Sequence, residues 1–148
     1  MSSFHSDLLA SALFSKIYRY DVKNLQLYHS RLSYKNLKLL STGVTQCSLN
    51  SVVIKYDNAE KVPMEDIIQL FSCDTIVSMF FANSSFNAFC KSYDDFIDAC
   101  NTVQKVKLNY LPVDFNVHRF YQCLKKTKSH ALIAIHSFYI SLDVNETV

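Results

Sequence analysis

The sequence predicts an α/β fold in which parallel strands and helices alternate along the chain and stack into a short solenoid. Short runs with apolar residues at every second position alternate with runs whose apolar residues lie three and four positions apart, which are the periods of a strand and a helix. Strand–helix–strand segments of this length favour parallel pairing with right-handed crossovers. A chain of 148 residues fits one domain, predicted over residues 1–148.

The first half of the chain provides the clearest turn and cap signals. It is predicted to hold a capping helix within residues 1–21, a strand over 22–28, a short helix capped by Ser33, and a strand over 44–50 that extends through 52–54. Gly43, the only glycine, is expected at the C′ position of the short helix, where glycine adopts a positive φ without a Cβ clash.

The second half continues the same alternation. It is predicted to hold a helix with Pro63 at its N1 position, a strand over 75–81, helix within 84–100 capped by Ser92, a strand over 103–109, a helix capped by Asn116, and a strand over 131–142. Residues 143–148 are expected to form a polar tail. The strand midpoints are spaced by roughly 25 to 30 residues, which fits leucine-rich-repeat-like units over residues 22–142.

The composition indicates a folded protein from a reducing compartment. The hydrophobic share of 49% and the charged share of 19% argue against disorder. Five cysteines without C-x-x-C spacing argue against a disulfide framework or a zinc site. No apolar run is long enough to span a bilayer, and the N-terminus does not resemble a signal peptide. We therefore expect an intracellular protein, cytoplasmic or nuclear, without membrane contact, metal or cofactor.

Several segments together resemble a known family. They are residues 36–40, 44–49, 62–68, 113–121, 125–128 and 131–135. In these segments the chain is similar to the C-terminal region of nematode F-box proteins, the F-box-associated (FTH-like) family. The resemblance implies a non-catalytic protein–protein interaction module that recognises substrates for a ubiquitin ligase.

Members of that family normally carry the module behind an F-box that docks onto a Skp1-type adaptor. About twenty residues precede the first predicted strand, which is too few for a complete F-box. This argues against a Skp1 contact, and we expect a stand-alone or truncated module with an unknown protein partner.

Two groups of residues are candidates for an interaction surface. Tyr18, Tyr20, Tyr28 and Tyr34 lie close together in sequence, and tyrosine is enriched at protein interfaces. The alternative is that they cap the open end of the solenoid. Lys125, Lys126 and Lys128 near Tyr121 suggest a second function, nucleic-acid binding through a basic and aromatic surface. The alternative for these lysines is a solvated helix end.

Catalytic motifs are weak, and we expect no enzymatic activity. A nucleophilic pair of Cys123 with His118 or His130 would need spatial proximity that the sequence does not indicate. The acidic cluster of Asp94, Asp95 and Asp98 fits the first turns of a helix, where carboxylates are favoured, better than an acid–base or metal site.

The predicted core and the C-terminal edge are the remaining expectations. One core should contain Leu25, Leu27, Cys47, Leu49, Val106, Leu108, Ile133 and Ile135. The run over residues 132–142 has little charge and is expected to end the sheet with an unpaired edge. Such an edge would support self-association or the addition of a partner strand.

Overall fold

A six-stranded sheet dominates the computed structural model, which describes residues 22–81, 90–112, 115–127, 131–136 and 141–143. Its strands are β1 (Asn24–Tyr28), β3 (Gln46–Asn50), β5 (Ile76–Phe80), β6 (Lys105–Asn109), β7 (Ile133–His136) and β8 (Ser141–Asp143). The first five are parallel and lie side by side in chain order, and β8 pairs antiparallel with β7. The predicted α/β class with mostly parallel strands is confirmed.

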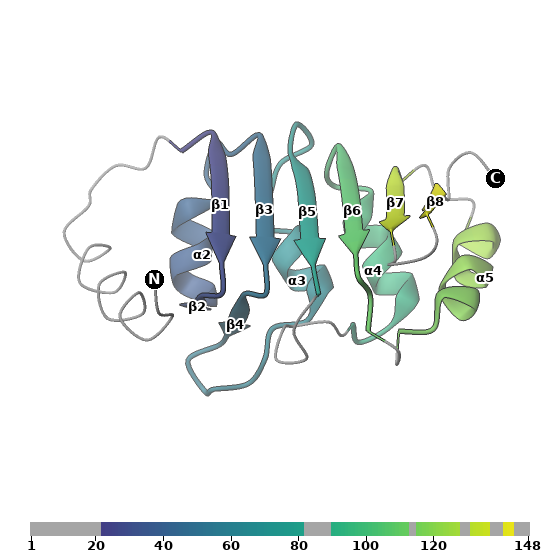
Figure 1. The fold of residues 1–148 in the computed structure, drawn as a ribbon, viewed down its shortest axis with the longest axis horizontal. Coiled ribbons are helices and arrows are strands. Elements are labelled where there is room, and N and C mark those ends of the chain that lie inside the picture. Colours follow the sequence, from purple (N-terminus) through teal and green to yellow (C-terminus); the bar gives the residue numbers. More distant parts are fainter. Residues whose placement is uncertain (1–21, 82–89, 113–114, 128–130, 137–140, 144–148) are drawn as a thin grey trace.

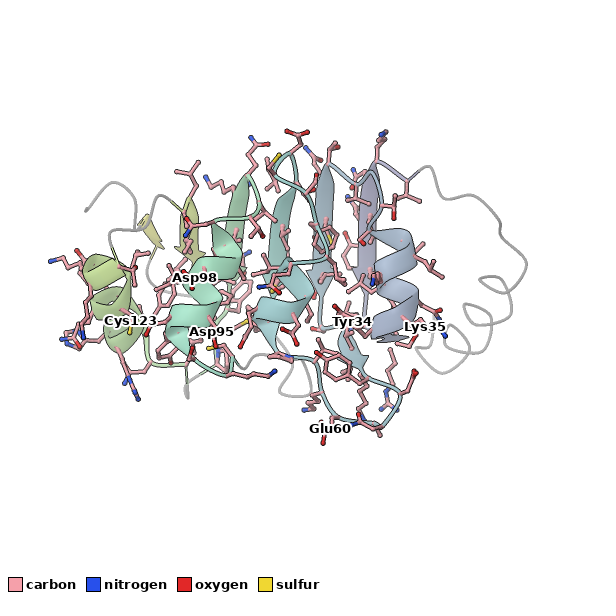
Figure 2. The ribbon with its side chains drawn as sticks, turned by 180° about the vertical axis from the view of Figure 1, so that it is seen from behind. Tyr34, Lys35, Glu60, Asp95, Asp98 and Cys123 are labelled. Atoms are coloured by element: carbon pink, nitrogen blue, oxygen red, sulfur yellow. The ribbon has the colours of Figure 1, made fainter. Side chains whose placement is uncertain are left out.

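The helices divide the molecule into a covered and an uncovered side. They are α2 (Tyr34–Leu40), α3 (Met64–Ile68), α4 (Tyr93–Cys100) and α5 (Val117–Thr127). Helices α2, α3 and α4 lie behind the sheet and cover one of its faces, while α5 lies at the β8 end (Figure 1). Figure 2 shows the molecule turned by 180°, so that this covered side faces the viewer. A small second sheet, formed by β2 (Arg31–Ser33) and β4 (Val53–Lys55), lies at the C-terminal ends of β1 and β3.

The predicted helix caps are confirmed. The hydroxyl of Ser33 accepts a hydrogen bond from the backbone N–H of Asn36 at 3.1 Å. The hydroxyl of Ser92 accepts one from Asp95 at 3.0 Å. These bonds satisfy N–H groups that have no partner within the first turn of a helix. The side chain of Asn116 accepts one from Arg119 at 3.0 Å in the same way.

Register places the core in two straight rows across the sheet. One row contains Leu25, Cys47, Val77, Val106 and Ile133, and the other contains Leu27, Leu49, Met79, Leu108 and Ile135. All are buried except Leu27, which is partly buried against the same core. The predicted core positions are therefore confirmed. Residues of α2, α3 and α4 such as Leu37, Ile67 and Phe96 are fully buried in the same cluster.

Two backbone positions differ from the predictions. Gly43 has the expected positive φ of 78°, but it lies two residues beyond the C-cap Ser41 instead of at C′. It belongs to a turn closed by a hydrogen bond from Val44 N–H to the Ser41 carbonyl at 3.2 Å. Pro63 is the N-cap of α3 and not its N1 residue, because its ψ of 156° is extended.

The strand predicted over 44–54 is in fact two strands. Ser51 interrupts it with a φ of 53°, which lies outside the extended region of regular strands. The segment after Ser51, β4, leaves the main sheet and pairs with β2. The break lets Val52 and Ile54 become fully buried on the far side of the turn.

The prediction of one C-terminal edge strand over 132–142 is also wrong. Strand β7 ends at His136 and pairs with β6 on one side and with β8 on the other. The backbone of β7 is therefore occupied on both sides, and the unpaired edge expected for this run does not exist along Ile133–His136. Residues 137–140, including the predicted strand centre, lie outside the described residues.

Other predictions fall outside the described part of the chain. They concern the capping helix within 1–21, the helical segment before Cys90, and the polar tail after Asp143. Within the ranges that are described, no helix is long and apolar enough to cross a membrane.

Candidate interaction surface

The open face of the sheet is the side that no described helix covers (Figure 1). Because successive side chains of a strand point to opposite faces, the residues between the buried ones lie on this side. We define the open face by Asn24, Gln26, Tyr28, Gln46, Ser48, Asn50, Ile76, Ser78, Phe80, Lys105, Lys107 and Asn109, all of which are exposed or partly exposed. Ala134, the outward residue of β7, is only 5% exposed, so the open face ends at β6.

The β1–β3 half of the open face offers neutral hydrogen-bonding groups. Asn24, Gln26 and Gln46 are exposed amides, and Gln46 pairs in register with Asn24. Tyr28 is 54% exposed, and its hydroxyl donates to the side-chain oxygen of Gln26 at 3.3 Å. A side chain with an apolar ring and a polar tip suits a protein interface.

The β5–β6 half combines apolar and cationic side chains. Ile76 and Phe80 are partly exposed on β5, with Ser78 between them. Lys105 lies in register with Ile76, and Lys107 with Ser78. Neither lysine forms an ion pair with a described residue. No outward position of the five parallel strands carries a carboxylate.

A repeated turn limits the open face at the C-terminal ends of the strands. His29, Ser51 and Tyr110 directly follow β1, β3 and β6, and their φ angles are 46°, 53° and 57°. Residues other than glycine rarely adopt this left-handed conformation. Hydrogen bonds help to hold it: His29 N–H donates to the Asn50 carbonyl at 2.9 Å, and Ser51 N–H donates to that of Phe80 at 3.1 Å.

The structure does not bring the predicted tyrosines into one patch. Tyr28 lies on the open face, whereas Tyr34 begins α2 on the helical side (Figure 2). The ring of Tyr34 packs against that of Tyr56, with centroids 5.1 Å apart. Burial, with a contribution from Asp66, raises the pKa of Tyr34. Tyr18 and Tyr20 lie outside the described residues.

The predicted basic surface is at the end of α5. Lys125 and Lys126 are exposed in its last turn, where positive charge interacts favourably with the helix dipole. The ammonium of Lys125 lies over the ring of Tyr121, 5.0 Å from its centroid, so this aromatic face is already occupied. Lys128 lies outside the described residues.

A second group of polar residues lies on the helical side, around α3. Glu65 is only 3% exposed; one carboxylate oxygen accepts the N–H of Lys91 at 2.7 Å, and the other has no hydrogen-bond partner among the described residues. Burial raises the pKa of Glu65, against the opposing effect of two backbone hydrogen bonds. The neighbouring Asp66 accepts a hydrogen bond from the Tyr56 hydroxyl and lies 4.0 Å from the Lys91 ammonium.

Two thiols near this group, those of Cys90 and Cys100, have raised pKa values. Burial, with Glu65 and Asp95 nearby, raises the pKa of Cys90 to about 12. Burial raises the pKa of Cys100 well above that of a free thiol. Since the thiolate is the nucleophile, a thiol with so high a pKa remains protonated at neutral pH. The raised pKa of Cys47, about 12, has the same cause.

The predicted catalytic pair is not assembled within the described residues. The ring of His118 contacts the side-chain amide of Gln122 at 3.1 Å, and no hydrogen bond joins it to Cys123. His130 lies outside the described residues. Asp94 and Asp95 are exposed in the first turn of α4, as predicted, with Asp98 one turn later (Figure 2). Among the described side chains no group of His, Cys, Asp and Glu could hold a metal ion.

Sequence reasoning did not identify the open face, although the signal was available. The alternation that located Val106 and Leu108 in the core also assigns Lys105, Lys107 and Asn109 to the opposite side. What the sequence lacked was the register between strands, which places Lys105 beside Ile76 of a distant segment. Comparison with protein-family models, curated proteins and solved structures yields no significant match for the chain.

Proposed function

We propose that the chain is a non-catalytic protein-interaction module that binds a partner protein through the open face. The observation that carries this proposal is the difference between the two faces of the same strands. The inward rows are apolar and buried beneath helices, whereas the outward rows hold amides, hydroxyls, aromatic rings and lysines that no described helix covers. A sheet face without a packing role in the domain is available for recognition.

The same proposal describes the architecture as a leucine-rich-repeat-like solenoid. Such repeats carry apolar residues in an L-x-x-L-x-L-x-x-N/C-x-L frame. Two consecutive segments match its apolar positions, whereas Ser30 and Val52 stand at the Asn/Cys position. The matching residues are Val22, Leu25, Leu27 and Leu32 in the first segment, and Val44, Cys47, Leu49 and Ile54 in the second. The frames are in register, since Leu25 pairs with Cys47 and Leu32 with Ile54. Parallel strands in chain order, with helices on one side, agree with this arrangement.

The role that fits this architecture is substrate recognition of the F-box-associated type. The similarity of several segments to that family supports it, and the open face provides a surface on which a substrate could dock. Repeat proteins generally recognise partners through the extended surface that stacking creates.

A comparison of two tryptophan variants tests the proposal. Ser78→Trp places a bulky uncharged ring in the middle of the open face, and Gln69→Trp adds the same ring at an exposed position on the helical side. Tagged wild type and both variants would be incubated with native extract and the bound proteins compared by mass spectrometry, after thermal unfolding has shown that both variants fold. We expect proteins that bind wild type and Gln69→Trp but not Ser78→Trp.

Equal recovery by all three proteins would contradict the use of the open face. Recovery of a Skp1-type adaptor together with a face-dependent substrate would support a ligase role. Recovery of the substrate alone would support a stand-alone module.

A further inference from the structure

We infer that the segment bound by the open face is acidic and also carries an apolar side chain, and that the β5–β6 half recognises it. This inference rests on the proposed function and names the chemistry of the partner. Lys105 and Lys107 are the charged residues of the open face. Both lysines lack an ion-pair partner among the described residues, so their charges are free to attract a partner's carboxylates.

The spacing of these groups restricts the geometry of the partner. Lys105 and Lys107 are two residues apart on one strand, so their backbone positions are separated by roughly 7 Å. Ile76 and Phe80 lie on the adjacent strand, with Ile76 in register with Lys105. Carboxylates about two residues apart in an extended peptide match the lysines. An apolar side chain beside them can cover Ile76 or Phe80, which supplies the affinity that exposed ion pairs alone do not.

Two other occupants fit the surface less well. Two lysines offer far fewer phosphate contacts than the roughly 6–10 that strong nucleic-acid binding uses. A second copy of the chain could present Asp94, Asp95 and Asp98, which are exposed on α4. That contact would join opposite sides of two molecules, so it would build a ring or an open filament and not a simple two-fold dimer. A foreign acidic segment avoids this, and we commit to it.

The test uses a phage-displayed library of random peptides selected on the folded full-length chain. Selected peptides are then titrated against wild type, Lys105→Glu/Lys107→Glu, Lys105→Gln/Lys107→Gln and Ser78→Trp, which obstructs the face without changing its charge. The matched control, Lys125→Glu/Lys126→Glu, makes the same charge change on α5, away from the open face. Sedimentation of the wild-type chain over a concentration series examines the second-copy alternative.

We expect the selected peptides to be enriched in Asp and Glu next to apolar residues, with affinity that falls as salt is added. The charge reversal Lys105→Glu/Lys107→Glu should weaken binding about tenfold or more, the neutral pair should weaken it less, and the α5 control should leave it unchanged.

The inference would be overturned by neutral peptides that bind the open face with an affinity unchanged by the substitutions at Lys105 and Lys107. That result would leave the proposed function intact. Peptides that bind Ser78→Trp as well as wild type, or no enrichment at all, would overturn both. If the wild-type chain self-associates and the charge reversal on β6 abolishes this, the occupant of the open face is a second copy of the chain and not a foreign partner.

Discussion

Thr75 donates its hydroxyl to the backbone carbonyl of Val44 at 2.6 Å, and both residues are buried. Val44 precedes β3 and Thr75 directly precedes β5, so this bond joins the N-terminal ends of two neighbouring parallel strands. The backbone continues the contact, since Ile76 N–H donates to the Thr45 carbonyl at 3.0 Å. A buried carbonyl that loses its donor carries a desolvation cost, so the threonine side chain has a structural role at this point.

Replacing Thr75 with valine should lower the free energy of unfolding by about 1–3 kcal/mol, because the shape is kept while the donor is lost. Chemical denaturation at neutral pH measures the change. The control is Thr102→Val, whose hydroxyl donates to the Ala99 carbonyl at 2.6 Å at the exposed end of α4. There water can replace the lost donor, so a loss as large as that of Thr75→Val would contradict the role of burial.

Leu49 lies at the centre of the second core row, between Leu27 and Met79, and is fully buried. Leu49→Ala should lower the free energy of unfolding by about 2–5 kcal/mol, since it removes apolar contacts and leaves a cavity. Leu39→Ala is the matched control, because Leu39 is 42% exposed on α2. A denaturation midpoint of Leu49→Ala that equals that of Leu39→Ala would show that Leu49 is not in the core.

Local periodicity explains which parts of the fold were predictable. The strands around Leu49 and Leu108 alternate between buried and exposed residues over their full length, and the caps Ser33 and Ser92 are followed by helical spacing. These signals need only neighbouring residues, so they can be recognised without tertiary structure. The strand break at Ser51 was missed because serine gives no signal for a positive φ.

Features that depend on distant segments were not predictable in the same way. The sequence predicts one strand for the C-terminal run because residues 137–140 contain no glycine, proline, asparagine or aspartate to mark a turn. Glu65 has the pattern of an ordinary first-turn acid, yet the approach of the Lys91 segment buries it. The pairing of Lys105 with Ile76 follows from the register of β5 with β6, which the sequence does not specify locally.

Gly43 provides a test of backbone strain. Its φ is 78°, and a Cβ at this position would meet only the Lys23 ammonium at 3.6 Å, an ordinary contact. Any cost of Gly43→Ala therefore comes from the left-handed backbone and should be about 1–2 kcal/mol in the free energy of unfolding. Gly43→Asn should cost less, because asparagine tolerates this conformation. Thermal or chemical denaturation ranks the variants, and equal stability of Ala and Gly would refute the assigned strain.

The buried carboxylate of Glu65 should make stability depend on pH in a defined direction. Burial raises its pKa in the folded chain, so between the ordinary carboxyl pKa and this raised value the folded state binds more protons than the unfolded state. Its contribution to stability is therefore fully present at low pH and is lost as pH rises through the raised pKa. Glu65→Gln, which stays neutral and keeps an oxygen for the Lys91 N–H, should be at least as stable as wild type at neutral pH and lose this advantage on acidification. Unfolding free energies over about pH 4 to 8 measure the effect.

The control variant Glu60→Gln removes an exposed carboxylate and corrects for the change in net charge. A difference between Glu65→Gln and wild type that stays constant with pH, after this correction, would refute the assignment.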